Sequence, residues 1–193
     1  MGAVERPMIR GERIWLRPFE EADLRPYRDF ANSAEGQIAG FSLPMSEESA
    51  RSWYASIQKK QGQDGYFFVI SPLGSEEFVG SIWLWNIGGR LQGAELSMFI
   101  AERDRWGRGI GTDAINAALD FAFGHRDLHR VWLFTDAPNE RAQRAFEKAG
   151  FAREGTLRRH IRRNGHLIDS VLMAILREEW EALDRKRSWD YAG

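Results

Sequence analysis

The residues best placed to bind a ligand through the main chain form a glycine-rich segment at positions 106–112. It reads Trp106-Gly107-Arg108-Gly109-Ile110-Gly111-Thr112 and precedes an alanine-rich stretch with helical spacing. Glycines permit a tight turn and let a ligand approach the N–H groups. The first turn of a helix adds free N–H donors and the positive end of a dipole. The segment is therefore expected to bind an anion such as a phosphate, unless it is a plain structural turn.

Two common phosphate-binding motifs do not fit this segment. The dinucleotide pattern G-x-G-x-x-G, started at Gly107, requires a third glycine where the chain has Thr112. The Walker pattern requires a Gly-Lys-Ser/Thr sequence, which the chain lacks. The ligand is therefore expected to be a phosphate compound of another class.

A second motif narrows the choice. Asn139-Glu140-Arg141-Ala142 is followed by Phe146-Glu147-Lys148-Ala149-Gly150-Phe151. With the glycine-rich segment, this motif resembles the GNAT superfamily of N-acetyltransferases. That family has an Arg/Gln-x-x-Gly-x-Gly/Ala turn before one helix and an Asn-x-x-Ser/Ala helix that ends in Lys-x-Gly-Phe. The resemblance covers roughly residues 10–180. Within it, Arg17-Pro18 and residues 165–173 resemble a branch that acetylates ribosomal-protein N-termini, polyamines and some aminoglycoside-type drugs.

The resemblance implies a fold and a set of cofactor contacts. The fold is an α/β domain with a mixed, mostly antiparallel, V-split sheet, flanked by about four helices. Acetyl-CoA, the co-substrate, lies in the split, with its thioester and pantetheine arm on the fourth strand and its pyrophosphate on the glycine-rich turn. The implied cofactor-binding residues are Phe99, Ile100, Ala101, Trp106, Gly107, Arg108, Gly109, Ile110, Gly111, Thr112, Asn139, Ala142 and Phe146.

The chain departs from the family pattern at two positions. Trp106 replaces the Arg or Gln of the turn, which matters little if backbone groups bind the pyrophosphate. Phe146 replaces a tyrosine that in many members protonates the departing thiolate, and phenylalanine has no proton to give. The general acid is therefore open, and so is the alternative of a non-catalytic acyl-CoA-binding protein.

Glu95 is the candidate general base. Acetyl transfer requires a neutral amine, whereas an alkylammonium has a pKa of about 10, so a group must accept a proton. Glu95 begins the predicted fourth strand, and strand alternation puts residues 95, 97 and 99 on one face. Some family members use a glutamate at the corresponding position as base. The alternative is a solvated strand-end carboxylate or an ion-pair partner.

The histidines are less promising. His125 and His129 lie in a connection that is expected at the surface, whereas His160 and His166 flank the last hairpin, which in this family borders the acceptor site. The chain has no His-Glu-x-x-His spacing and no cysteine, so we expect no metal.

Aromatic and basic residues leave further alternatives open. Trp53, Trp83 and Trp85 could line a pocket for a cationic amine, or pack in the core. The basic run at 158–163 is either a solvated hairpin face or a contact for the CoA 3′-phosphate or an acidic partner.

Periodicity and turn residues predict the elements that must position these groups. Strands are expected at 14–17, 66–70, 78–87, 94–101, 130–135, from 151 onward and at 167–177, and helices at 21–32, 46–60, 109–123 and 140–149. This order predicts a mixed sheet with an antiparallel meander and one βαβ unit. The charged chain beyond Trp180 is expected to fray.

Composition bounds the remaining possibilities. The 193 residues fit one acetyltransferase domain, with a core at about 10–180 and a charged tail at 181–193. A net charge of −1 argues against a nucleic-acid binder, and no apolar run is long enough to span a membrane. Met1 to Arg10 has no signal-peptide core, so we expect a cytoplasmic location.

The sequence thus predicts an N-acetyltransferase. It would move the acetyl group from acetyl-CoA directly to a primary amine, since no nucleophile for a covalent route is evident. A protein N-terminus and a small amine such as a polyamine or aminoglycoside are the competing acceptors, and a homodimer is possible.

Overall fold

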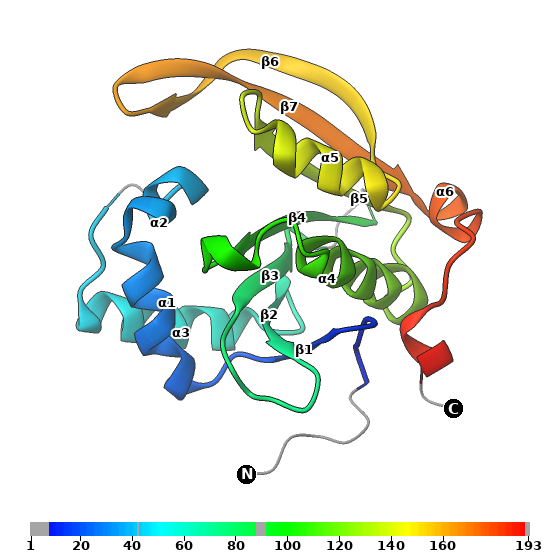
Figure 1. Ribbon diagram of the computed structural model, residues 1–193, viewed down its shortest axis with the longest axis horizontal. Coiled ribbons are helices and arrows are strands. Elements are labelled where there is room, and N and C mark those ends of the chain that lie inside the picture. The colour runs from blue at the N-terminus through cyan, green and yellow to red at the C-terminus, as the bar shows by residue number, and fades with distance from the viewer. Residues whose placement is uncertain (1–7, 42, 88–91, 192–193) are drawn as a thin grey trace.

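The computed structural model describes residues 8–41, 43–87 and 92–191. A seven-stranded sheet runs through the molecule in the order β1-β2-β3-β4-β5-β7-β6, with helices on both faces (Figure 1). The strands are β1 (Ile14–Pro18), β2 (Gly65–Pro72), β3 (Gly80–Trp85), β4 (Gly93–Ile100), β5 (Arg130–Asp136), β6 (Ala152–Arg163) and β7 (His166–Leu176). The helices are α1 (Leu24–Ala31), α2 (Ala34–Ala39), α3 (Glu47–Lys60), α4 (Ile110–Leu119), α5 (Glu140–Lys148) and α6 (Arg177–Glu181).

The sheet is mixed and mostly antiparallel, which confirms the predicted fold class. β1 to β4 pair as an antiparallel meander, and β7 pairs antiparallel with both β5 and β6. The parallel pair is β4 with β5, joined through α4. This β4–α4–β5 connection is the predicted βαβ unit.

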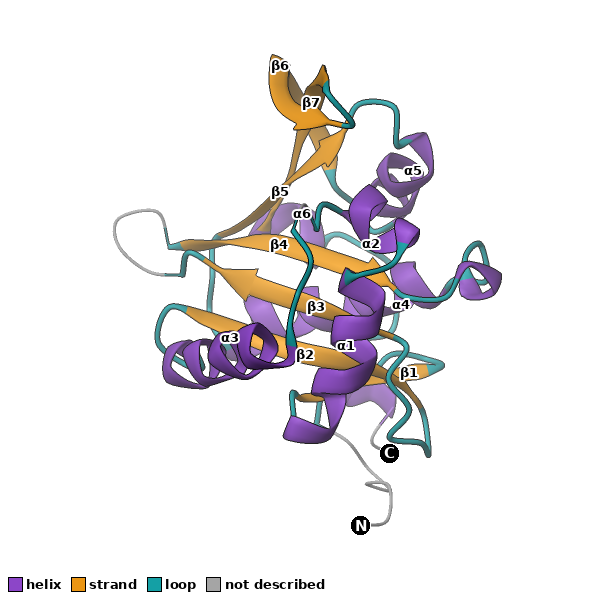
Figure 2. Ribbon diagram, turned by 90° about the vertical axis from the view of Figure 1, so that its left-hand side faces the viewer, coloured by secondary structure: helices purple, strands orange, loops and turns teal. Residues whose placement is uncertain are grey.

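The parallel pair is short. It comprises Gly93 with Arg130, Ala94 with Val131 and Glu95 with Trp132, after which β4 continues to Ile100 beside no β5 partner. β5 instead continues to Asp136 paired with β7. The two strands diverge from Glu95 onward, as Figure 2 shows, and this divergence is the predicted split of the sheet.

Different side chains cover the two faces of the sheet. One face packs against α4 through aliphatic residues such as Leu96, Ile115 and Leu133. The other packs against α1 and α3 through aromatic residues, including Phe30 stacked on Phe99 with ring centroids 4.3 Å apart. Alternation along β4 therefore directs even-numbered residues toward α4 and odd-numbered residues toward α1.

The first predicted helix, 21–32, differs in the structure. A 3₁₀ turn at 21–23 precedes α1, so Pro26 falls in the first turn of the helix, where it removes no helical hydrogen bond. The helix α2, which the sequence analysis missed, follows at once. Ser33 caps it by accepting from the Gly36 N–H, and Gly40 ends it in the left-handed conformation with φ 110°.

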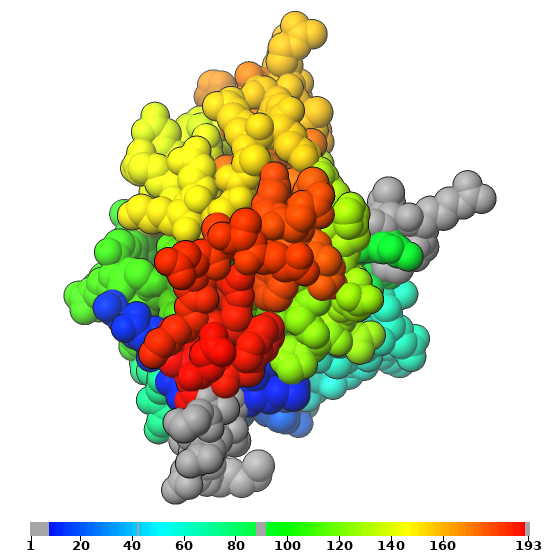
Figure 3. All heavy atoms as spheres, turned by 90° about the vertical axis from the view of Figure 1, so that its right-hand side faces the viewer, coloured from blue at the N-terminus to red at the C-terminus, as the bar shows by residue number. Residues whose placement is uncertain are grey.

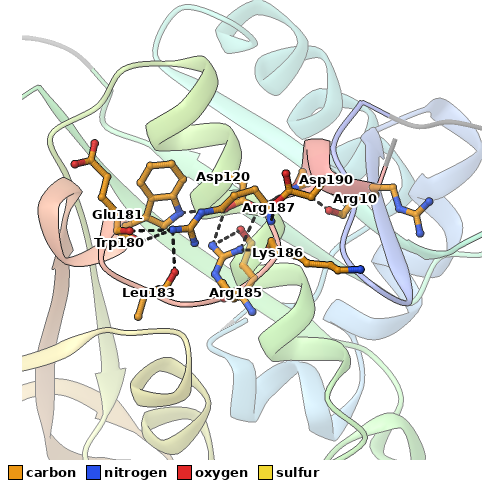
Figure 4. A network of polar contacts seen from close by, with 11 residues as sticks. Arg10, Asp120, Trp180, Glu181, Leu183, Arg185, Lys186, Arg187 and Asp190 are labelled. Carbon is orange, nitrogen blue, oxygen red and sulfur yellow. Dashed lines mark hydrogen bonds and ion pairs between the residues drawn. The ribbon is translucent and has the colours of Figure 1, made fainter. Parts of the chain in front are cut away.

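The expectation that the chain frays beyond Trp180 is wrong for residues 181–191. Asp120, 1% exposed, follows α4 and accepts hydrogen bonds from Trp180 Nε1 at 3.0 Å, Arg185 Nη2 at 2.6 Å and the Ser188 N–H at 2.7 Å (Figure 4). Ser188 Oγ also donates to the Arg10 carbonyl. The tail thus lies against the body beside the N-terminal segment (Figure 3). Arg185 of the tail is paired with a buried carboxylate, a partner that a local sequence pattern does not reveal.

Among the residues described, no helix combines the length and the apolar character that a membrane span requires.

Removal of Asp120 tests the anchoring of the tail. Asp120→Ala leaves a guanidinium, an indole N–H and a main-chain N–H without their acceptor, so we expect a loss of about 3–5 kcal/mol in the free energy of unfolding. Asp127→Asn is the matched control, because Asp127 pairs with Arg177 while its side chain is 96% exposed, and asparagine tolerates its left-handed backbone, with φ 53°. This control is expected to lose less than about 1 kcal/mol in the same urea titration. Equal, small losses in both variants would contradict the anchoring role.

Candidate active site

The glycine-rich turn leads directly into α4. Gly107 and Gly109 have φ of 73° and 83°, a left-handed conformation that glycine adopts without strain. Gly109 is the N-cap, and no side chain caps the helix among the described residues. The first helical hydrogen bond runs from the Asp113 N–H to the Gly109 carbonyl at 2.9 Å. The N–H groups of the preceding residues, 110–112, are therefore the donors that the start of a helix leaves free.

Contacts on the outer side hold this turn in place. The Asp113 carboxylate accepts from the N–H groups of Glu12 and Arg13, both at 2.8 Å, and of Ile14 at 3.2 Å. Arg13 Nη1 donates to the Arg108 carbonyl at 2.8 Å. The N-terminal segment thus fixes both the residue before Gly109 and the first turn of α4, while the donors at 110–112 have no side-chain partner within the described part of the chain.

A cavity of about 490 Å³ lies where β4 and β5 diverge, beside this turn. β4 contributes residues 96–100 and β5 contributes residues 134–136, while α4, α5, α1 and α2 complete the walls. Ten of the thirteen predicted cofactor residues line it: Phe99, Ile100, Trp106, Gly107, Gly109, Gly111, Thr112, Asn139, Ala142 and Phe146. The two motifs, distant in sequence, therefore border one cavity.

Three predicted cofactor residues do not line this cavity. Arg108 and Ile110 instead border a smaller cavity, shared with Arg13, behind the turn. Ala101 faces β3, because its N–H donates to the Val79 carbonyl at 2.9 Å. That N–H is therefore engaged within the fold, and the cofactor contact that the resemblance implies for Ala101 stays a prediction.

The same hydrogen bond fixes which main-chain groups of β4 face the gap. Main-chain groups in an antiparallel pair point to the partner strand at every second residue, so those of Phe99 also point to β3. Those of Met98 and Ile100 point toward β5, where the pairing has ended. Trp106 Nε1 occupies the Ile100 carbonyl at 3.0 Å. Met98 was missed by the sequence analysis; the strand register identifies it.

The second motif forms α5. The Asn139 side chain caps the helix, with Oδ1 accepting from the Ala142 N–H at 3.2 Å, so its amide N–H₂ is left for other contacts. Phe146 lies further along the same face of α5 and is 7% exposed. Its ring packs edge-to-face against that of Phe151, with ring centroids 5.6 Å apart. No tyrosine lines the cavity in the part of the chain that the structure describes.

Cationic side chains border the cavity along α5. The Arg141 guanidinium lies 3.5 Å from the centroid of the Trp106 ring, and burial, with Arg103 nearby, lowers the pKa of Arg141. Arg144 and Lys148 line the same wall. The sequence analysis assigned Arg141 no role, although its position two residues after Asn139 placed it in the first turn of α5.

Glu95 lies at the last residue pair before the strands part. It is half-buried and shares the α1 face of β4 with Ser97, which lines the cavity, but Glu95 itself does not. Burial raises the pKa of Glu95, and a hydrogen bond from Asn86 Nδ2 to Oε2 at 3.1 Å partly opposes this shift. The carboxyl is thus better matched to accept a proton near neutral pH than a solvated glutamate.

Apart from Arg163, the other candidates do not line the cavity. Trp53 stacks on Tyr27 at 4.2 Å, Trp83 packs in the same aromatic cluster, and Trp85 is exposed; none of the three lines the cavity. His125 and His129 are exposed, as expected. Of the basic run 158–163, Arg163 reaches the cavity. Within residues 8–41, 43–87 and 92–191, no group of three His, Asp or Glu side chains is arranged to hold a metal ion.

Comparisons with known proteins agree with this geometry. Residues 13–152 match the acetyltransferase (GNAT) domain family. The chain is 29% identical over 181 residues to the probable N-acetyltransferase YjcK of Bacillus subtilis, covering 90% of this chain and 99% of that protein.

Two solved structures are similar along most of the chain. Spermidine N-acetyltransferase from Vibrio cholerae, in complex with CoA and spermine, superimposes with a TM-score of 0.77 at 25% identity over 87% of this chain and 98% of that one. Mycobacterium smegmatis RimJ, in complex with CoA-disulfide, gives a TM-score of 0.78 at 25% identity over 91% of this chain and 86% of that one. The protein belongs to the GNAT acetyltransferase family.

Proposed function

We propose that the protein transfers an acetyl group from acetyl-CoA to a primary amine by direct attack. The observation that carries this proposal is the cavity at the β4–β5 divergence, which joins an uncapped helix start to main-chain groups on the unpaired edge of β4. Support also comes from the similar Vibrio cholerae and Mycobacterium smegmatis structures, which are complexes with CoA and spermine and with CoA-disulfide.

In this proposal the cofactor binds mainly through the main chain. Its pyrophosphate accepts hydrogen bonds from the N–H groups at 110–112, where the helix dipole favours an anion. Its pantetheine arm pairs with the main chain of Met98 and the N–H of Ile100, as an added strand would. Asn139 and Ala142 contact the arm from α5, and Arg141 is available to a phosphate. The thioester then lies near Phe146.

The chemistry is addition of the amine nitrogen to the thioester carbonyl carbon, followed by cleavage of the C–S bond. The products are an acetamide and the CoA thiol. Glu95 takes the proton from the incoming ammonium. A water relays this proton, because Glu95 shares a strand face with Ser97 of the cavity wall but does not itself line the cavity. The raised pKa of Glu95 suits this role.

Phe146 limits the ways in which the thiolate can be protonated. A free thiol has a pKa of about 8.5, so a thiolate is a tolerable leaving group without a positioned acid. The sulfur then takes a proton either from the ammonium of the tetrahedral intermediate or from a water. Phe146 is also the observation that favours the alternative function, a non-catalytic acyl-CoA-binding protein.

Thiol release from acetyl-CoA across an amine library tests the proposed function. We expect release that depends on the amine, with acetylated product found by intact mass. Tight CoA binding without release by any amine would support the acyl-CoA-binding alternative.

Valine substitutions in the turn test the main-chain contacts. A Cβ on Gly111 would meet only Met98 Cε at 3.7 Å, so Gly111→Val is expected to fold normally. Its side chain would still block a phosphate, and CoA affinity should fall at least about tenfold, or about 1.4 kcal/mol. Gly109→Val should lose affinity and also stability, since its φ is 83°. Gly74→Val is the control for this backbone strain, because Gly74 has a similar φ of 75° but lies in the turn after β2. Calorimetry showing normal CoA affinity in folded Gly111→Val would contradict the assignment.

Kinetics of Glu95 variants test the general base. Glu95→Gln should lower kcat by about 10²–10⁴-fold with little change in CoA affinity. The carboxylate is the active form, so the wild-type rate should rise as pH increases through the raised pKa of Glu95. Asn86→Ala removes the hydrogen bond that lowers this pKa and should move that limb to higher pH. A loss below about threefold in Glu95→Gln, or an unmoved limb in Asn86→Ala, would return Glu95 to a structural role.

A further inference from the structure

We propose that the acceptor is an amine that carries no second cation and has an apolar group next to its nitrogen. This apolar group would lie on the α2 side of the cavity. This inference rests on the proposed function and deepens it by naming the acceptor's chemistry. It draws on five residues from three elements: Glu35 and Ile38 of α2, Phe134 and Asp136 of β5, and Arg163 of β6.

These residues lie on the face of the sheet opposite α4. Val131 and Leu133 of β5 pack in the α4 core, so strand alternation turns Phe134 and Asp136 toward the other face. Arg163 Nε donates to Asp136 Oδ2 at 2.9 Å, and Arg163 Nη2 lies 3.1 Å from the site of a Cβ on Gly40, at the end of α2. Arg163 therefore joins β5 to α2 across this side of the cavity.

Both carboxylates that line the described cavity are already paired with arginine. Asp136 and Arg163 are 20% and 24% exposed in their side chains, and Glu35 pairs with Arg103 Nε at 3.0 Å. A second ammonium on the acceptor would find each carboxylate already neutralised by a guanidinium, which weakens the attraction that either could offer. Among the described residues, Arg105 and Arg144 are paired with glutamates, whereas Arg141 and Lys148 have no ion-pair partner and would repel a second ammonium.

Two apolar side chains are instead exposed to an acceptor in the cavity. Ile38 is 52% exposed and Phe134 is 41% exposed, although both line the cavity. They flank the ion pair: Ile38 is two residues before Gly40, and Phe134 is two residues before Asp136. An apolar group beside the amine would cover both side chains and release the water on them, whereas a second ammonium there would lose part of its hydration.

The test compares amines matched in length. We expect kcat/KM for hexylamine to exceed that for 1,6-diaminohexane and spermidine by about tenfold or more, after correction for the fraction of neutral amine. Arg163→Gln frees the Asp136 carboxylate and should raise the ratio of kcat/KM for 1,6-diaminohexane to that for hexylamine several-fold. Arg153→Gln is the matched control, since Arg153 is exposed on the same strand and bonds only to Thr156 Oγ1 among the described residues.

A second pair of variants reports on the apolar surface itself. Phe134→Glu adds a carboxylate inside the cavity and should reverse the preference toward the diamine. Leu157→Glu adds the same charge at a 38% exposed position that does not line the cavity, and the preference should not change.

The outcomes separate this inference from the proposed function. A wild-type preference for spermidine or 1,6-diaminohexane over hexylamine would overturn the acceptor assignment while supporting acetyl transfer. Thiol release by no amine would overturn acetyl transfer itself, and the acceptor assignment with it. An equal response of Arg163→Gln and Arg153→Gln would show that the Asp136 pair does not select the acceptor.

Discussion

The short parallel pairing between β4 and β5 is the constraint on which the rest of the site depends. Because it ends at Glu95 and Trp132, β4 keeps main-chain groups directed at a partner strand that has moved away. β5 stays in the sheet beyond this point, since β7 pairs with its other edge along its whole length. The cavity, the free main-chain groups of β4 and the position of Glu95 where the strands part all follow from this one divergence.

The start of α4 carries a cost that the surrounding chain offsets. A helix N-terminus without a side-chain cap forgoes about 1 kcal/mol of capping stabilisation. The structure holds the turn by other means, through the Asp113 carboxylate and the Arg13 guanidinium on its outer side. The far end of the same helical segment is held by Asp120 and the C-terminal tail. The helix is thus fixed at both ends, while the N–H groups of its first turn stay available beside the cavity.

Much of this arrangement could be predicted from the sequence, because it depends on local signals. Glycine spacing placed the turn before α4, and periodicity with turn residues predicted the antiparallel meander and the βαβ unit, while the resemblance to the GNAT superfamily supplied Asn139. What local signals do not carry was missed. The α2 helix is too short for a periodic pattern, and the main-chain direction at Met98 depends on the pairing of β4 with β3.

Long-range pairing explains the largest error. The tail beyond Trp180 is rich in charge, and a charged terminus usually remains solvated. Its partner, Asp120, is buried and lies more than sixty positions earlier, as the pairing with Arg185 shows. Such a pair becomes visible only when the fold brings the two segments together.

Backbone amide shifts on addition of CoA would test the central claim most directly, namely that the main chain at the divergence binds the cofactor. In a ¹⁵N-labelled sample, the account predicts the largest shifts at Ile110, Gly111 and Thr112 and at Met98 and Ile100, with small shifts at Phe99 and Ala101. Saturable binding that leaves the amides of 110–112 unshifted, or that shifts Phe99 and Ala101 more than Met98 and Ile100, would contradict it.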